Sequence, residues 1–303
     1  MKLFTRFPDG AEEGGQSVGD RLGAWAEICL NAVVGGRDAV ARLSEAAGRR
    51  VVAAHAEAYR ADDPETIGVD EAAEAAILEV VRRAGVNATV LSEEAGEVRL
   101  TGAGEPVFVV VDPFDGSSLY RHGIRAFWYS AVGVLAADGR PLAGACLDLI
   151  HGTVEVAGEG KGFTGRLEGT TLRDAVPLRA SGVTRLQGAR LEAYMMKPAF
   201  LRAALDRAGP LLRAAGFVLP NGGPPGFADV AAGRVDLYVG LQQGPTEIFS
   251  ALALAEAAGA TVTDLAGQQL RFVPDLAATH DVLCAATPAL HREALQALRA
   301  GGR

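Results

Sequence analysis

Two aspartates three residues apart, Asp112 and Asp115, are the side chains in this sequence best suited to chemistry. They follow a near-continuous apolar run, residues 106–111, and Pro113 and Gly116 favour a tight turn. Carboxylates held this close repel each other unless a proton or a cation lies between them. Oxygen ligands select hard cations such as Mg²⁺ or Mn²⁺. The same pentapeptide is also typical of a plain turn, so by itself it leaves both interpretations open.

Three further acidic positions could belong to the same site. Glu93 ends a short apolar segment, Asp70 opens a helix with one apolar face, and Glu247 lies near the start of another predicted helix. Each has a structural interpretation as well: an exposed acidic loop, a helix N-cap, or a residue that complements a helix dipole. They gain meaning only if the fold brings them to Asp112.

Small residues follow the acidic motif, at Gly116, Ser117 and Ser118. If a helix begins there, its unpaired backbone N–H groups would bind an anion. A carboxylate metal site next to an anion site suits the transfer of a phosphoryl group to water. The glycine-rich segment 158–169 lacks the Gly-Lys-Ser/Thr ending of a phosphate-binding P-loop.

The elements that must position these residues change character near residue 180. Before it, a buried strand over 107–111 runs into Asp112, and strand-like stretches between 129 and 156 predict an antiparallel meander. After it, helices and strands alternate, and one helix is expected over 246–258. We therefore expect an N-terminal α+β lobe over 1–180 and a C-terminal α/β lobe over 181–303. Helical spacing over 20–47 predicts a helix that Gly35 and Gly36 break or kink.

Bulk composition excludes several classes of function. The formal net charge is -8 and no basic run is present, which argues against nucleic-acid binding. The three cysteines are far apart, so a cysteine zinc site is not expected. The first residues lack the apolar core of a signal peptide, and no run approaches the ~20 apolar residues of a membrane span. We therefore expect a cytoplasmic protein with no membrane partner.

Taken together, four segments resemble the superfamily of inositol monophosphatase and fructose-1,6-bisphosphatase, lithium-sensitive and magnesium-dependent phosphatases. The segments lie in the family's order over roughly residues 55–290, with the archaeal and bacterial dual-specificity type as the nearest likeness: residues 66–70, 91–96, 111–118 and 246–264. The resemblance implies a layered α/β/α/β/α sandwich, a small phosphorylated metabolite as substrate, and a homodimer. Inositol monophosphate and fructose 1,6-bisphosphate are the substrates it suggests.

The resemblance also implies a role for each residue, with two or three Mg²⁺ ions, or Mn²⁺ in their place. Glu93, Asp112 and the Phe114 carbonyl would hold one ion, and Asp112, Asp115 and Glu247 a second. Ser117, hydrogen-bonded to Asp70, would activate a metal-bound water, and the amides of Gly116, Ser117 and Ser118 would hold the phosphate. Lys197 and Arg202 are weaker candidates for substrate contact, since both are also typical of solvated surface residues.

Two departures from the family pattern keep alternatives open. Thr246-Glu247 stands where the family usually has Trp-Asp, and no acidic residue is found near Gly240, where the family binds the inositol ring. One alternative is a phosphatase of 3'-phosphoadenosine 5'-phosphate, which ranks lower because no aromatic or basic adenine site is evident. The other is a phosphatase-like binding or regulatory protein with a degenerate second metal site.

Overall fold

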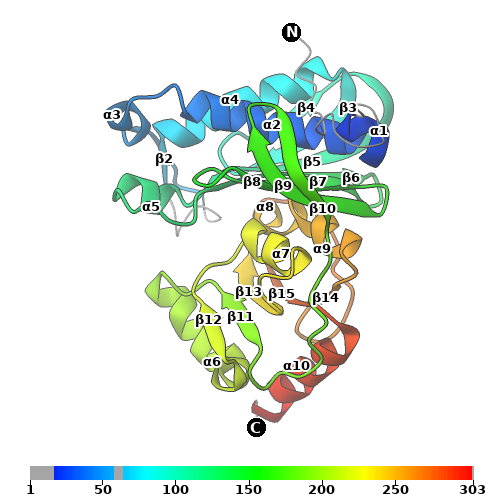
Figure 1. The fold of residues 1–303 in the computed structure, drawn as a ribbon. Helices are drawn as coiled ribbons and strands as arrows, with labels where there is room; N and C mark the ends of the chain where they lie inside the picture. Colours follow the sequence, from blue (N-terminus) through cyan, green and yellow to red (C-terminus); the bar gives the residue numbers. More distant parts are fainter. Residues whose placement is uncertain (1–16, 58–63, 302–303) are drawn as a thin grey trace.

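The computed structural model describes residues 17–57 and 64–301, which form five alternating layers of helices and sheets (Figure 1). Outer helices cover one face of a large sheet, a group of short helices lies between the large sheet and a smaller one, and two more helices cover the far side. The layered α/β/α/β/α sandwich predicted from the sequence is therefore confirmed. No helix in these two ranges combines the length and the apolar character needed to cross a bilayer.

The large sheet has eight strands in the order β10-β9-β8-β7-β6-β5-β3-β4. Only β3 and β5 run parallel, because every other neighbouring pair is antiparallel. The predicted meander is thus confirmed, and it extends further than expected. The strands are β3 (Val86–Ser92), β4 (Gly96–Leu100), β5 (Ala103–Asp115), β6 (Tyr129–Ala136), β7 (Pro141–Asp148), β8 (Thr153–Gly158), β9 (Lys161–Glu168) and β10 (Thr171–Pro177).

The smaller sheet has five strands in the order β12-β11-β13-β15-β14, with β11 parallel to both of its neighbours. A separate two-stranded sheet pairs β1 (Val51–Ala54) with β2 (Glu65–Ile67). The strands of the smaller sheet are β11 (Arg190–Ala193), β12 (Phe217–Leu219), β13 (Leu237–Gln243), β14 (Thr261–Thr263) and β15 (His280–Ala285).

The helices fall into the three remaining layers. On the outer face of the large sheet lie α1 (Val18–Leu22), α2 (Ala24–Val40), α3 (Glu45–Gly48) and α4 (Gly68–Arg83). The middle layer holds α7 (Pro224–Ala231), α8 (Pro245–Phe249) and α9 (Leu252–Ala257), and the last layer α6 (Pro198–Ala214) and α10 (Pro288–Gly301). A short helix, α5 (Ser117–Arg121), follows β5. The single helix expected over 246–258 is therefore two helices, because Ser250 and Ala251 interrupt it.

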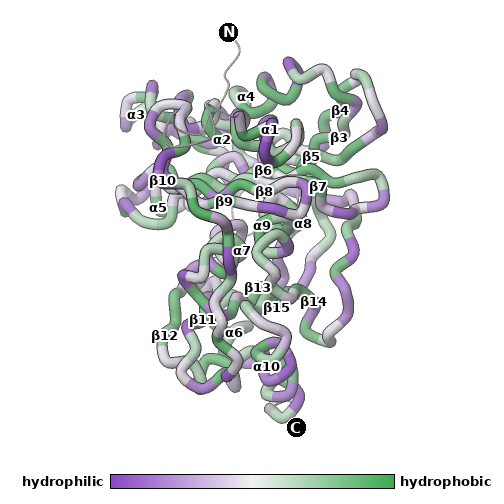
Figure 2. The backbone as a smooth tube through the Cα atoms, turned by 45° about the vertical axis from the view of Figure 1, so that its right-hand side comes forward, coloured by the Kyte–Doolittle hydropathy of each residue, from purple (hydrophilic) through white to green (hydrophobic). Residues whose placement is uncertain are grey.

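Both sheets share the apolar core of the middle layer. One cluster of buried residues joins Val110 of the large sheet, Phe249 of α8 and Cys284 of the smaller sheet. The hydrophobic stretches in Figure 2 accordingly run through the middle helices, while purple, hydrophilic segments lie mainly on the loops and on one side of α10. The middle helices thus bury apolar surface against both sheets at once.

Gly35 and Gly36 do not break their helix, so the predicted break is wrong. Helix α2 continues through both residues, because the missing side chains let it pack closely on α4. A Cβ on Gly36 would lie 3.3 Å from Ile77 Cδ1, and a Cβ on Gly35 would lie 3.3 Å from Val80 Cγ2. The contact that small residues permit outweighs the ~1 kcal/mol helix penalty of glycine.

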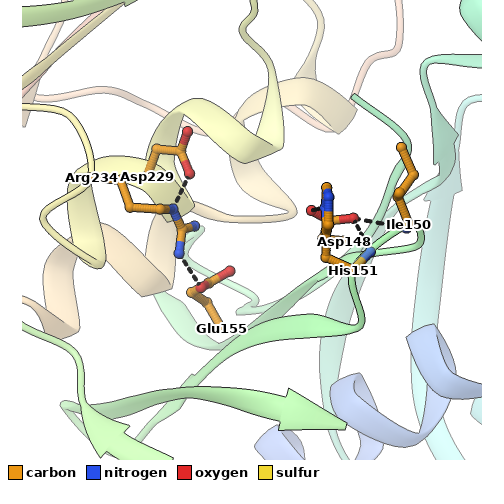
Figure 3. A network of polar contacts seen from close by, with 6 residues as sticks. All are labelled: Asp148, Ile150, His151, Glu155, Asp229 and Arg234. Carbon is orange, nitrogen blue, oxygen red and sulfur yellow. Dashed lines mark hydrogen bonds and ion pairs between the residues drawn. The ribbon is translucent and has the colours of Figure 1, made fainter. Parts of the chain in front are cut away.

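An ion network joins the large sheet to the middle layer (Figure 3). Arg234 pairs with Glu155 of β8 at 2.7 Å and with Asp229 of α7 at 2.5 Å. Burial opposes the charge of Arg234, but the two carboxylates outweigh it and raise the pKa of the guanidinium. Thr164 donates a further hydrogen bond to Glu155 at 2.8 Å. Two nearly buried carboxylates therefore depend on one arginine from a neighbouring loop.

Candidate metal centre

The parallel pairing of β3 and β5 brings two acidic motifs to one edge of the large sheet. Ser92 pairs with Val111, so Glu93 and Asp112 follow at the ends of adjacent strands. The Glu93 amide donates to the Val111 carbonyl at 3.3 Å, which extends the pairing by one step. The neighbouring strands on which the interpretation of Glu93 depended are thus confirmed.

Asp112 lies at the centre of the acidic residues and is 1% exposed. Its Oδ1 atom is buried and accepts no hydrogen bond from any described residue. Burial raises the pKa of Asp112 well above its usual range, and nearby carboxylates raise it further: Glu93, Asp115, Glu247 and Glu94. A buried carboxylate surrounded by others is costly unless a proton or cation compensates it.

A bulge in β5 explains how Asp115 joins Asp112. Asp112 pairs with Ala131 of β6 and Asp115 with Tyr129, so three residues of β5 advance against two of β6. Side chains three apart on a regular strand would face opposite sides, and one extra residue restores the same side. Pro113 therefore stays within β5, and the chain turns at Gly116, whose φ is 97°.

Glu247 reaches the site from the first turn of α8. Its carboxylate lies against Gly223, at the start of α7, so closely that a Cβ on Gly223 would overlap Glu247 Oε2. The same Cβ would lie 3.8 Å from Asp115 Oδ2. Gly223 therefore sits between two carboxylates and leaves room for the longer side chain that stands where the family usually has aspartate.

We expect Gly223→Ala to raise the Mg²⁺ concentration for half-maximal activity by about tenfold or more. The new methyl group would displace the Glu247 carboxylate, and Mg²⁺ requires its ligands at near-ideal positions. A Mg²⁺ titration of phosphate release measures this. The positive φ of 73° adds strain as well, which needs a separate control.

Gly259→Ala is that control. Gly259 has a φ of 80°, and a Cβ there meets no atom of the described residues within 4 Å. Both variants carry the backbone strain, but only Gly223→Ala should change the Mg²⁺ requirement. Equal Mg²⁺ requirements in the two variants would rule out this role for Gly223.

The loop that carries Glu93 is held by Glu74, a residue that the sequence analysis missed. The side chain of Glu74 accepts a hydrogen bond from Ser92 Oγ and another from the Ala95 amide at 2.7 Å. The sequence contained a sign of this role, because Glu74 lies on the buried, apolar face of α4, one turn after Asp70 and one turn before Ile77. A charged residue on a buried helix face needs a partner, here the Glu93 loop.

The phosphate side of the site is built on Gly116. The residue adopts a left-handed conformation at the N-terminus of α5, and a Cβ there would overlap the Phe127 carbonyl. Ser117 and Ser118 follow directly and line a cavity of about 260 Å³. Asp70 is buried. Its Oδ2 atom accepts a hydrogen bond from the Ile67 amide at 2.8 Å, which closes the first turn of α4. A hydrogen bond between Asp70 and Ser117 stays a prediction.

The cavity gathers most of the predicted residues. Its lining includes Glu93, Phe114, Asp115, Gly116, Ser117, Ser118, Lys197 and Glu247. Asp112 and Asp70 lie buried rather than on the cavity wall. Arg202 is exposed on α6 and does not line the cavity.

The oxygen-only donor set and the unpartnered Oδ1 atom of Asp112 fit a hard divalent cation. As the side chains stand, no group of three or more His, Cys, Asp or Glu residues in the described ranges is arranged to hold a metal ion. Mutual repulsion opposes such an arrangement, and a cation between the carboxylates would remove that repulsion. The assignment of individual ligands is therefore a proposal, taken up below.

Known proteins match the chain over both sheets. The sequence matches the inositol monophosphatase family over residues 30–303. It is 28% identical over 200 residues to the Nus factor SuhB of Escherichia coli K12, covering 66% of this chain and 71% of that protein. The inositol-1-monophosphatase of Bacillus subtilis is 26% identical over 195 residues, which cover 62% of this chain and 66% of that protein. The structure of inositol monophosphatase from Anabaena aligns with a TM-score of 0.65 at 22% identity, and the alignment covers 91% of this chain and 95% of that chain.

Proposed function

The chain belongs to the inositol monophosphatase family and is a metal-dependent phosphatase of that type, and we propose that it uses Mg²⁺ to hydrolyse a small-molecule phosphate monoester. One observation carries the proposal: the buried Asp112 side chain, whose Oδ1 atom has no hydrogen-bond partner among the described residues, lies beside carboxylates that line a cavity that α5 also reaches. Carboxylate oxygens and backbone N–H groups on one cavity are the two parts that phosphoryl transfer requires.

The proposal places the ligands for two ions at this edge. Glu93, Asp112 and the Phe114 carbonyl would hold one, and Asp112, Asp115 and Glu247 the other. Mg²⁺ bound there would lower the pKa of water and neutralise charge on the phosphate oxygens. Glu247 suits this role despite its extra methylene group, because Gly223 leaves the space that the longer side chain takes.

The remaining residues would orient the substrate and move a proton. The backbone amides of Gly116, Ser117 and Ser118 would bind the phosphate oxygens, as N–H groups at the start of a helix do. The Ser117 hydroxyl, supported by Asp70, would orient the attacking water and take part in its deprotonation, with Glu93 close by. No covalent phosphoenzyme is required.

Phosphate release from a panel of esters tests the proposal. With Mg²⁺ we expect turnover of at least one phosphorylated polyol, sugar or ring alcohol, no turnover when EDTA replaces the metal, and inhibition by Li⁺. Absence of release from every ester, with the protein folded and Mg²⁺ present, would favour a phosphatase-like binding or regulatory protein instead. Size-exclusion chromatography with light scattering tests the homodimer that the resemblance implies.

A further inference from the structure

The cavity has a second wall, whose chemistry differs from that of the acidic edge. Five apolar or aromatic side chains from three segments, with three of them within residues 194–200, form what we call the ring wall: Phe127, Tyr194, Met196, Phe200 and Leu276. Carboxamides accompany them at Asn221, Gln242 and Gln243. Because the phosphate belongs at the acidic edge, this wall faces the alcohol part of the ester. The inference that follows rests on the proposed function.

Two rings of this wall are fixed against each other. Tyr194 follows β11 and Phe200 lies in the first turn of α6, and their ring centroids are 5.0 Å apart at 67°, an edge-to-face contact. Such pairs hold both rings in place. Met196 beside them is 38% exposed, so the apolar surface is open to a ligand rather than sealed by the protein. Sequence analysis found no such platform, although Tyr194, Met196 and Phe200 are close in the chain, because the spacing alone does not show that their side chains face one cavity.

Two non-glycine residues of the cavity have strained backbones. Phe127 has a φ of 56° and Gln242 a φ of 55°, values that side-chain-bearing residues rarely adopt. Such strain costs on the order of 1–3 kcal/mol per residue and persists where the surroundings impose it, often at ligand sites. The Phe127 carbonyl lies so close to Gly116 that a Cβ on Gly116 would overlap it, which places the ring wall next to the phosphate side.

The charges of the cavity oppose a bisphosphate. Lys197 is the sole cation among the described residues that line it, against the carboxylates of Glu93, Asp115 and Glu247. A second phosphate would therefore meet little positive charge. Position 240, where the family would place an acid for ring hydroxyls, is closed to any side chain. A Cβ there would lie 2.7 Å from each of three side chains, those of Tyr238, Gln243 and Val282.

We propose that the substrate is the monophosphate ester of an alcohol that carries a flat, uncharged ring, and that the ring packs on Tyr194 and Phe200. The carboxamide of Gln242, which also lines the cavity, is the group that would hydrogen-bond polar atoms at the ring's edge. In the reaction, water adds to phosphorus, the bond between phosphorus and the ester oxygen breaks, and a proton from water ends on that oxygen. The products are the ring-bearing alcohol and inorganic phosphate.

Benzyl phosphate and inositol 1-phosphate make a sharp comparison, because both esters release an alkyl alcohol and differ mainly in the ring. With Mg²⁺ we expect kcat/KM for benzyl phosphate to exceed that for inositol 1-phosphate and for fructose 1,6-bisphosphate by about tenfold or more. Phe200→Ala should lower kcat/KM for benzyl phosphate about tenfold, mostly through KM, and should lower kcat/KM for glycerol 2-phosphate by a clearly smaller factor. Leu201→Ala is the matched control, since Leu201 is an exposed neighbour on α6 outside the cavity lining.

The outcomes separate this inference from the function on which it rests. Efficient hydrolysis of inositol 1-phosphate with equal or weaker activity on benzyl phosphate would contradict ring binding at this wall and leave the proposed phosphatase function standing. An equal loss on benzyl phosphate and glycerol 2-phosphate in Phe200→Ala would overturn it too, because the ring contact would then not be specific. Hydrolysis of no ester at all would defeat the proposed function and this inference with it. Circular dichroism of each variant confirms that its fold is kept.

Discussion

Asp112→Asn abolishes phosphate release and leaves the metal-free protein at least as stable as the wild type. The carboxylate is fully buried, and neighbouring carboxylates repel it, so an uncharged amide of the same shape relieves that repulsion. Loss of a shared ligand should lower kcat by at least about a thousandfold, because metal ions contribute several kcal/mol to such reactions. Thermal unfolding and single-substrate kinetics, each with and without Mg²⁺, measure both effects.

Mg²⁺ itself supplies a readout that does not depend on catalysis. Saturation at 100 times Kd would stabilise the wild type by about 2.7 kcal/mol. Asp112→Asn should lose most of that stabilisation. Asp138→Asn is the control, because Asp138 only caps the Arg140 amide in an exposed turn at 3.0 Å. An Asp112→Asn protein with the full rate, or with unchanged stabilisation by Mg²⁺, would show that the metal lies elsewhere.

The second large effect concerns stability, at the ion network of Figure 3. Arg234→Met should lower the free energy of unfolding by about 2–3 kcal/mol, because it leaves the carboxylates of Glu155 and Asp229 without their cation. Two-fifths of the Arg234 side chain stays exposed, so water screens part of the interaction and the loss falls below that of a wholly buried pair. Urea denaturation monitored by circular dichroism gives the value.

Two comparisons make this result specific. Arg83→Ala removes an exposed pair with Glu79 at 2.7 Å and should change stability by no more than about 0.5 kcal/mol. In a Glu155→Gln background, Arg234→Met should cost less than it does alone, since one of the two stranded charges is gone. Additive losses in that double variant would mean that Arg234 acts through packing of its stem rather than through Glu155.

The local pattern predicted much of the site because the chemistry lies at strand and helix ends. Apolar runs before Glu93 and before Asp112 identified two buried strands, and their parallel pairing sets both carboxylates at one edge. The bulge between Asp112 and Asp115 was not predictable, since an extra residue depends on the partner strand. Gly223 was missed for a related reason: its role is the space it leaves for a side chain from another helix.

Errors in the predicted fold arose where a tertiary contact outweighed a local preference. Gly35 and Gly36 suggested a break or kink in the helix, but their small size lets α2 pack closely on α4. The break that does occur is near Ser250, whose side chain donates to the Thr246 carbonyl at 2.6 Å. Phe127 of the ring wall lies far in the chain from Tyr194 and Phe200, and only the fold shows that all three line one cavity.

The shared core of the middle layer has a consequence for synthesis on the ribosome. The large sheet is complete once β10 has emerged, yet the apolar face around Val110 is covered only by helices that are translated later, such as α8 with Phe249. At ~5–20 residues per second that interval lasts on the order of ten seconds. During it, the nascent chain exposes an apolar sheet face that the folded protein buries, which is the condition under which partly folded chains aggregate.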